Sequence, residues 1–314
     1  LNGNVTVANA LNVNAVGDLT LTENKQLKVA SVSELNAASI DFEAGSKAEL
    51  AGQSSMLSNL ADIKLNDIDA LSGLSLNSAG QVAFTGNLKV GQLQQGEIQP
   101  SSFTGDLTIN AAQAVSLAAN QLLTVGGNVS VNAESFTMAT QSQIEADGHV
   151  HVDVLNDINI AQATSHADKV NAFNLNAQNG AINGNIDSLV HLTGTGIQSG
   201  AILNAATGIG SQTSEHNISS TTGLGNPFVV DIPWISASTK TGDVNLVGNS
   251  DLHATLLKTG NGNIRVRGME DLTIDELVGT PWLYVDGFFY AGDMTMDRGE
   301  IAAKQGMEIE NILL

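Results

Sequence analysis

The chain has 314 residues, and its 42% hydrophobic content is enough to bury a sizeable core. It contains no cysteine, which excludes disulfides, thiolate metal sites and cysteine nucleophiles. With 32 acidic against 12 basic side chains, the formal net charge is −20. This charge argues against a nucleic-acid or anionic-membrane partner, because phosphate groups are bound by clustered lysine and arginine.

Only 14% of the residues are charged, whereas glycine alone accounts for 32 positions. Such a composition is typical of short strands joined by many turns. There is no uninterrupted apolar run long enough to cross a bilayer, so we expect no membrane insertion. The chain opens at Leu1 without an initiator methionine or a charged leader, and we interpret it as an internal piece or a mature fragment of a longer protein.

A five-residue signature recurs from the first residues onward: glycine, then aspartate or asparagine, then an apolar, a polar and an apolar residue. The alternation predicts a strand of about three residues with one buried face. Glycine tolerates positive φ and an Asp or Asn side chain binds the backbone two residues on, so the first two positions predict a turn. Copies occur at 3–7, 17–21, 86–90, 105–109, 127–131, 242–246, 262–266 and 292–296, and copies lacking only the glycine at 61–65, 156–160 and 270–274.

The spacing of these strands predicts how they assemble. A second apolar position follows the first at a fixed offset in several repeats, as Val115 follows Leu107. Strands that keep such an offset over long distances stack as the coils of a solenoid. We therefore predict an all-β protein, a parallel β-helix with about 20–22 residues per coil and roughly 15 coils in a rod. The first apolar positions repeat at this spacing in three series: Leu107, Val129 and Val150; Val244 and Ile264; Leu272 and Met294.

Two stretches fit this pattern less well. Residues 31–60 carry enough alanine and leucine that a short helix on the outside of the rod is an alternative. Residues 193–241 are rich in Gly, Thr and Ser, contain two prolines and hold no copy of the signature. We expect them to form an irregular loop or insertion that divides the rod into a first block at 1–192 and a second block at 242–314.

The chain resembles the repetitive passenger regions of large bacterial exoproteins, the filamentous-haemagglutinin-like and autotransporter-like surface proteins. The resemblance rests on the signature coils and on abundant Asn, Gly, Ser and Thr without Cys. It also rests on Ala205-Ala206-Thr207-Gly208-Ile209-Gly210-Ser211, a Ser/Thr-rich stretch and then Thr241-Gly242-Asp243-Val244. The resemblance implies a right-handed β-helix, located extracellularly or on the bacterial cell surface, that acts as a stalk, adhesin or fibre.

Two patterns permit metal binding. Asp147, His149, His151 and Asp153 alternate with apolar residues, so all four are expected on one outward face, where paired imidazoles can share a divalent ion. The simpler interpretation is a solvated strand face. Signature aspartates on successive coils are the second pattern, a candidate for structural calcium, although turn hydrogen bonding already explains them. These are Asp18, Asp106, Asp243, Asp271 and Asp293.

Catalytic signals are weak. Strings typical of pectin-degrading β-helix enzymes are absent, and Arg265 and Arg267 are the one pair of outward cations that could neutralise uronate carboxylates. Seven of the twelve aromatic residues follow residue 227, and they predict either a sugar-stacking or protein-docking surface or internal packing, with Trp282 and Tyr284 the candidates for exposure. These are Phe228, Trp234, Trp282, Tyr284, Phe288, Phe289 and Tyr290.

We assign no catalytic, cofactor-binding or metal residue from the sequence. The prediction is a structural and adhesive rod, not an enzyme, that mediates surface attachment or cell-cell contact. Neither end shows an amphipathic cap, so each is expected to stack on further coils of a longer chain or on a neighbouring subunit end to end. A host, cell-surface or glycan ligand is the other partner that we expect. The alternatives are a self-assembling filament subunit and, below it, a polysaccharide-active β-helix enzyme.

Overall fold

A computed structural model describes residues 1–92, 105–184, 191–211, 226–296 and 298–313. The described residues form 35 strands and no helix, and the strands stack in parallel as a β-solenoid of about 13 turns. The all-β parallel fold predicted from the repeat is confirmed. By its contacts the chain divides into two units, unit 1 at Leu1–Val154 and unit 2 at Leu155–Leu314.

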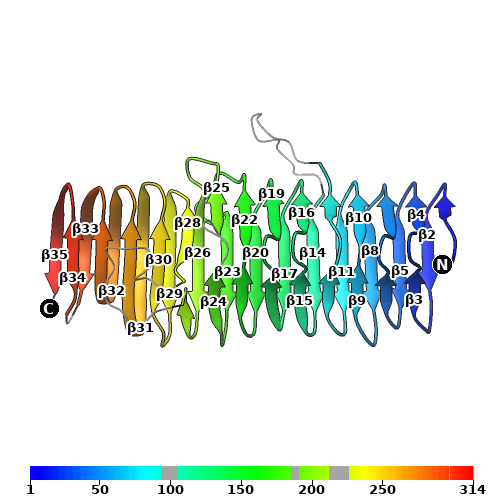
Figure 1. The fold of residues 1–314 in the computed structure, drawn as a ribbon, viewed down its shortest axis with the longest axis horizontal. Coiled ribbons are helices and arrows are strands. Elements are labelled where there is room, and N and C mark those ends of the chain that lie inside the picture. Colours follow the sequence, from blue (N-terminus) through cyan, green and yellow to red (C-terminus); the bar gives the residue numbers. More distant parts are fainter. Residues whose placement is uncertain (93–104, 185–190, 212–225, 297, 314) are drawn as a thin grey trace. The chain divides into compact units, whose positions relative to one another are not determined.

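In unit 1 each coil, meaning one turn of the solenoid, has three short strands, so three columns of stacked strands form (Figure 1). The first column contains β1 (Val5–Val7), β4 (Gln26–Val29), β7 (Lys47–Leu50), β10 (Asp67–Ala70), β13 (Leu88–Val90), β16 (Leu122–Val125) and β19 (Gln143–Ala146). The second contains β2 (Leu11–Asn14), β5 (Ser33–Ala37), β8 (Ser54–Ser58), β11 (Leu74–Ser78), β14 (Leu107–Ala111), β17 (Val129–Ala133) and β20 (Val150–Val154). The third contains β3 (Leu19–Leu21), β6 (Ile40–Phe42), β9 (Ile63–Leu65), β12 (Val82–Phe84), β15 (Ala114–Leu117) and β18 (Ser135–Met138).

Unit 2 begins with the same arrangement of three strands per coil. Its strands are β21 (Ile158–Ile160), β22 (Gln162–Ser165), β23 (Phe173–Ala177), β24 (Ala181–Gly184), β25 (Leu192–Gly194), β26 (Gly200–Ala205), β27 (Gly208–Ile209), β28 (Phe228–Asp231) and β29 (Trp234–Thr239). Several of them lie in the stretch 193–241, of which residues 212–225 lie outside the described part of the chain.

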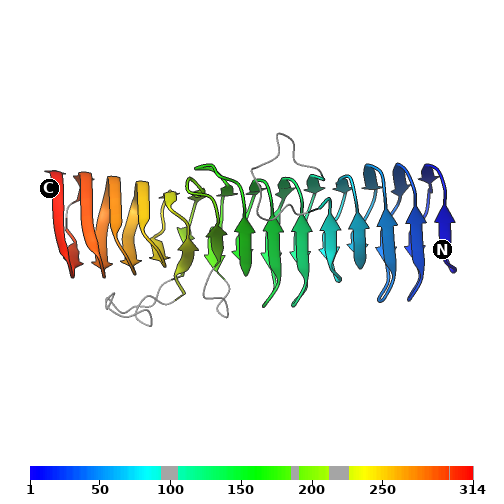
Figure 2. The same cartoon turned by 90° about the horizontal axis from the view of Figure 1, so that it is seen from above.

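The coil changes shape at β30 (Val244–Gly248), because β27 and β28 both pair with this one strand. Two columns merge there, and the following coils consist of fewer and longer strands, drawn yellow to red in Figure 2. These are β31 (Leu252–Gly268), β32 (Leu272–Val285), β33 (Phe288–Thr295), β34 (Glu300–Ala303) and β35 (Gly306–Leu313).

The register confirms most of the predicted spacing and corrects one series. Leu107 pairs with Val129 and Val129 with Val150, as the sequence steps predict. Leu272, however, pairs with Phe289 and not with Met294, which pairs with Leu277. Here β32 runs through both faces of a coil by itself, pairing with β33 before its corner and with β34 after it. Such a coil needs less chain than one of three strands and three corners, so the step from one coil to the next is shorter here than in the regular repeat.

The number of coils is also lower than predicted from the average repeat. Some coils are longer than that repeat, because Leu74 pairs with Leu107 and Ala201 pairs with Ile235. The extra residues of such a coil add no turn to the solenoid.

The helix considered for residues 31–60 is wrong, because β5, β6, β7 and β8 occupy that stretch. In β5 the buried positions are Ser33, Leu35 and Ala37, whereas Glu34 is exposed and Asn36 half-buried. The same alternation of inward and outward residues occurs in the strands that pair with β5, which are β2 and β8. Such tertiary pairing overrides the helix propensity of alanine and leucine.

The core is a set of apolar rows that run along the inside of the coils. One row of unit 1 has side chains no more than 2% exposed, and each of them contributes about 1.5–3 kcal/mol by burial. Its members, in paired register, are Leu35, Met56, Leu76, Ile109, Val131 and Val152. Outward residues of the same strands remain in contact with solvent, and the chemistry of the surface is therefore set by them.

Candidate functional site

The signature aspartates and asparagines join each coil to the next. The Asp106 Oδ1 accepts the backbone N–H of Asn128 at 2.8 Å, and the Asn128 Oδ1 accepts that of His149 at 2.9 Å. In unit 2 the Asp271 Oδ1 accepts the backbone N–H of Phe288 at 2.8 Å. These partners lie on the following coil and not two residues ahead, so the predicted turn bond is replaced by a bond between coils.

Inside the stack the signature glycine is required mainly for space, whereas at Gly3 and Gly17, in the first coil, a Cβ would meet nothing within 4 Å. A Cβ at Gly127 would lie 2.3 Å from the Asp106 Oδ1, in the position where the carboxylate reaches the next coil. Gly105 is the copy that does have positive φ, at 97°. The first two signature residues thus act together, because the side chain of one coil occupies the room left by the glycine of the next.

Hydrogen bonds between coils explain the signature aspartates in a way other than calcium binding. The Asp18 Oδ1 accepts the hydroxyl of Ser39 at 2.6 Å, and the Asp293 Oδ1 accepts the Asn311 amide at 2.8 Å. Within the described ranges, no group of three or more His, Asp or Glu side chains is placed to hold a metal ion.

The segment with alternating histidines is arranged differently from the prediction. His151 and Asp153 lie on the outer face of β20 and are half-buried, and His149 lies just before the strand. Asp147 was expected to point outward with them, but it is only 5% exposed. It lies at a coil corner, where its backbone N–H donates to the carbonyl of Val125 at 3.0 Å, so stacking of the corners buries it.

Unit 2 brings together two features that the sequence shows separately. Arg265 pairs with Trp282 and Arg267 with Tyr284 across β31 and β32, so the two arginines and two aromatics lie side by side on one outward face. We call these four residues the arginine–aromatic face. The arginine side chains are only 6% and 11% exposed.

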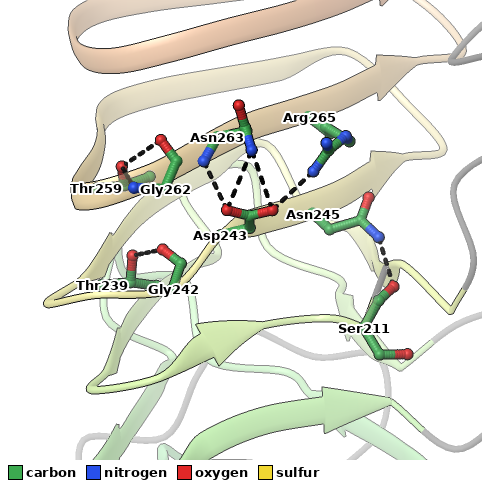
Figure 3. Close-up of polar contacts among 9 residues, drawn as sticks. All are labelled: Ser211, Thr239, Gly242, Asp243, Asn245, Thr259, Gly262, Asn263 and Arg265. Atoms are coloured by element: carbon green, nitrogen blue, oxygen red, sulfur yellow. Dashed lines mark hydrogen bonds and ion pairs between the residues drawn. The ribbon is translucent and has the colours of Figure 1, made fainter. Parts of the chain in front are cut away.

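Carboxylates of the chain neutralise both guanidinium groups. The Arg265 Nη1 donates to the Asp243 Oδ2 at 2.7 Å, and the Asp243 Oδ1 accepts the backbone N–H of Asn263 at 2.6 Å (Figure 3). The Arg267 Nη2 donates to Asp286 at 3.2 Å, and the Lys304 ammonium contacts the same carboxylate at 2.7 Å. These arginines are therefore engaged within the chain.

The electrostatics of Asp286 follow from these contacts. The hydrogen bond from Lys304 and the positive charge of Arg267 lower the pKa of the Asp286 carboxyl, despite the opposing effect of desolvation. The same bond raises the pKa of Lys304. Both groups are therefore charged at neutral pH, and they hold the residues after β32 and the residues after β34 together.

Aromatic packing completes the arginine–aromatic face. The Tyr284 ring lies between two cations, 5.2 Å from the Arg267 Cζ and 5.6 Å from the Lys304 Nζ. Trp282 and Tyr284 pack against Val229 and Val247, which are almost fully buried. Cation–π contacts and apolar burial both stabilise this arrangement, so part of each aromatic side chain serves packing within unit 2.

A second outward column in unit 2 is aromatic and acidic. The Trp234 ring stacks on the His253 ring with centroids 4.3 Å apart, and the His253 Nε2 lies 2.7 Å from the Asp275 Oδ1. Tyr290 continues the column through Thr273, which pairs with both His253 and Tyr290. Of the remaining aromatics, Phe228 and Phe289 are fully buried, and Phe288 is 38% exposed.

The environment of Tyr290 is strongly negative. A hydrogen bond with Glu310, together with the charges of Glu308 and Asp275, raises the pKa of the Tyr290 hydroxyl to about 12. The phenol is therefore neutral at any physiological pH and is available as an aromatic surface beside carboxylates.

A concave pocket of about 410 Å³ lies at a corner between the long strands of unit 2. β31 has four residues, 259–262, where β32 has only Gly279, because Lys258 pairs with Val278 and Asn263 with Thr280. The short corner of β32 thus leaves a hollow beside the longer corner of β31. We call this hollow the corner pocket.

The longer corner is held closed by its own threonine. The Thr259 hydroxyl donates to the Gly262 carbonyl at 2.8 Å and accepts the Gly262 N–H at 2.9 Å. The Thr239 hydroxyl likewise donates to the Gly242 carbonyl on the preceding coil (Figure 3). Gly279 has a φ of 147°, and a Cβ there would lie 3.2 Å from the Ile264 side chain, so the short corner depends on glycine.

The corner pocket was not anticipated from the sequence. Its lining includes Asn261, Val278, Thr295, Met296 and Arg298. The repeated Thr-x-x-Gly at 239–242 and 259–262, and its absence from the next coil, is the signal that could have indicated a missing corner. Arg298, the third arginine of the chain, gave no pattern because its neighbours come from other coils.

The fold and its surfaces define a repeat protein of the parallel β-solenoid class. No protein-family model, curated protein or solved structure matches the chain. The described residues include no helix long and apolar enough to cross a membrane.

Proposed function

We propose that this chain is a structural and adhesive segment of a secreted or surface-anchored bacterial exoprotein of the filamentous-haemagglutinin-like kind. The observation that carries the proposal is the repeated bonding between coils by signature Asp and Asn side chains, as between Asp106 and Asn128. Side chains that bond to the next coil, repeated along the chain, stabilise the stack of coils. A stack of this kind is suited to a structural role, because its length grows with each coil.

Polar ladders on the strands support the same role. The Asn110 Nδ2 donates to the Asn77 Oδ1 at 3.0 Å, and the Asn132 Nδ2 donates to the Asn110 Oδ1 at 3.1 Å. Inside unit 1, the Ser33 hydroxyl donates to Ser54 at 2.8 Å. Ladders of identical side chains add hydrogen bonds between stacked strands and resist local opening.

The adhesive part of the proposal is supported by the surfaces of unit 2. Trp234, Tyr290 and the corner pocket offer aromatic and polar groups of the kind that contact a host, cell-surface or glycan ligand. Attachment through such contacts requires no catalysis, and we propose that the chain is not an enzyme.

Adhesion is tested with beads coated with the purified chain and washed over a printed glycan array and over fixed cell layers. The proposal predicts retention above that of beads coated with albumin or with the urea-unfolded chain. Equal retention of all three kinds of bead contradicts it. A screen that detects turnover of plant or bacterial glycans contradicts the proposal that the chain is not an enzyme.

A filament subunit is the second candidate, and it predicts contacts between the last coil of one copy and a neighbouring copy. β35 pairs with β33 on one edge, and its Met307 and Ile312 are 46% and 50% exposed, although they continue the rows of Phe289 and Met294, which are buried. An open apolar edge accepts another coil, either of a longer chain or of a neighbouring subunit. Negative-stain electron microscopy separates the candidates: indefinite fibres indicate a filament subunit, and isolated particles of one length indicate a scaffold segment.

A further inference from the structure

We propose that the corner pocket of unit 2 binds a carboxylated sugar and that Arg298 pairs with the sugar carboxylate. This inference names a ligand class for the adhesive role proposed above and rests on that role. At this corner four residues of β31 lie opposite Gly279 alone in β32. A volume of about 410 Å³ lies within the range of about 300–1,000 Å³ usual for small-ligand sites.

The charges of unit 2 single out Arg298. The chain has three arginines, and Arg265 and Arg267 are paired with Asp243 and Asp286. Arg298 is exposed, and it has no hydrogen bond or ion pair with any residue that the structure describes. Its planar guanidinium offers two parallel N–H donors, which match the two oxygens of a carboxylate.

The rest of the lining suits a sugar ring. Asn261 and Thr295 are exposed, so an amide and a hydroxyl can bond to sugar hydroxyls from the two neighbouring corners. Val278 and Met296 are half-buried and present apolar surface to the C–H face of a ring. The Thr259 hydroxyl donates its hydrogen bond to the Gly262 carbonyl, so Thr259 shapes the pocket but does not donate to a ligand.

The net charge of −20 limits the length of the ligand. A long polyanion would be repelled by the whole chain, whereas a short one is screened from charges farther than about 10 Å at 0.1 M salt. We therefore expect a ligand with one or a few carboxylates, and we expect its binding to weaken as salt rises.

The test measures binding of trigalacturonate and of 3′-sialyllactose by calorimetry, with maltotriose as the neutral control. Binding of either acidic probe, with at least about tenfold loss in Arg298→Gln, supports the inference, since a hydrogen bond to a charged group is worth that much. The two probes distinguish a uronic acid from a sialic acid as the source of the carboxylate. Lys64→Gln is the matched control, because it removes one exposed charge from unit 1.

Three results overturn the inference: no binding of either acidic probe, equal binding by the native chain and Arg298→Gln, or equal loss in Lys64→Gln. Circular dichroism of each variant shows whether the fold is retained, and Arg298→Lys supplies a second variant with the charge kept. The bead assay separates this failure from that of the proposed function. Adhesion that survives Arg298→Gln leaves the adhesive role intact and removes the pocket, whereas Arg298-dependent probe binding without bead retention does the reverse.

Discussion

Asp243 and Arg265 form an ion pair that is largely removed from water, with side chains 15% and 6% exposed. Asp243 also accepts the backbone N–H of Asn263, so the same carboxylate serves as a bond between coils and as a counter-ion (Figure 3). Desolvation of two charges makes the net contribution of such a pair small, but loss of one partner leaves the other charge buried.

Asp243→Ala is therefore expected to lower the free energy of unfolding of unit 2 by about 3 kcal/mol or more, because it leaves the Arg265 guanidinium without a counter-ion. Urea unfolding followed by tryptophan fluorescence measures this, since both tryptophans, Trp234 and Trp282, lie in unit 2.

The matched control is Asp271→Ala. This aspartate bonds the backbone N–H of Phe288 in the same way but has no arginine partner in the described part of the chain, so a loss of about 1 kcal/mol is expected. Equal losses for the two variants would show that the ion pair adds nothing beyond the bond between coils.

His191 is a titratable group in the interior of unit 2, only 2% exposed. Its ring packs on Phe228 with centroids 5.4 Å apart, and its Nδ1 lies 3.2 Å from the Ala161 carbonyl. Burial lowers the pKa of the imidazole below its ordinary value of 6.5, and hydrogen bonds to the carbonyls of Ala161 and Pro227 offset part of that effect. The folded protein therefore favours the neutral ring.

A lowered pKa in the folded state makes stability depend on pH in a defined direction. The contribution of His191 is fully present above the unfolded pKa of about 6.5 and is lost as pH falls toward the lower folded pKa, because the unfolded chain then binds the proton first. We expect the free energy of unfolding of unit 2 to fall below pH 6.5 by up to about 1.4 kcal/mol per pH unit for this one group.

Urea unfolding at a series of pH values measures the effect. His191→Gln is expected to flatten the slope, because it removes the buried imidazole whose pKa is lowered in the folded state. An unchanged slope in His191→Gln contradicts the assignment.

At the scale of the element, the short strands of unit 1 are too small to be stable alone, since a strand of three to five residues has few contacts of its own. Each strand inside the stack is held by parallel neighbours on both sides, as β14 is by β11 and β17. The outward asparagines add a ladder across these same strands, with Asn110 bonded to both Asn77 and Asn132.

Asn110→Ala removes two hydrogen bonds of this ladder. We expect a loss of about 1 kcal/mol in local stability, because the ladder is exposed and water partly replaces the missing partners. Hydrogen–deuterium exchange of β11, β14 and β17 measures it as faster exchange in these strands.

Thr108→Ala is the control on the same strand, since Thr108 is outward and half-buried. Its exchange is expected to match that of the native chain. Faster exchange in both variants alike would assign the effect to the strand and not to the asparagine ladder.

At the scale of the whole molecule, stability is expected to be distributed along the coils, because each coil of a solenoid contacts only its neighbours. The contacts divide the chain into two units of similar size, and the coil shape changes within unit 2 from three strands to two longer faces. A protease must open several residues at once, so strand positions inside a stack are expected to be poor cleavage sites.

Trypsin tests this expectation. Lys64, Lys89 and Arg265 lie within strands, whereas Lys169 and Arg298 lie in turns. We expect the native chain to be cut first in the turns and the strand sites to be cut much later, as followed by mass spectrometry over time. The urea-unfolded chain provides the reference, and equal rates at strand and turn sites in the native chain contradict the prediction.

Sequence alone was enough to predict the all-β class, the parallel solenoid and the inward rows of unit 1. These three features depend on a period of two within each strand and on a step of about 21 residues between coils, as from Val129 to Val150. The first pattern is local and the second is repeated regularly, so both can be recognised in the sequence. The helix alternative for 31–60 was wrong, and the sequence could not exclude it because alanine and leucine fit a helix and a buried strand equally well until the neighbouring coils are known.

Only the tertiary structure decided where the chemistry lies. The burial of Asp147, the pairing of Arg265 with Trp282 and the partners of the signature aspartates all depend on residues one coil away. The corner pocket depends on a difference in length between consecutive corners, which shifts the register after Lys258 and places Arg298 and Asn261 around one hollow. A periodic sequence determines its average coil, but a surface site is made where one coil departs from its neighbours, and that departure is visible only when the coils are stacked.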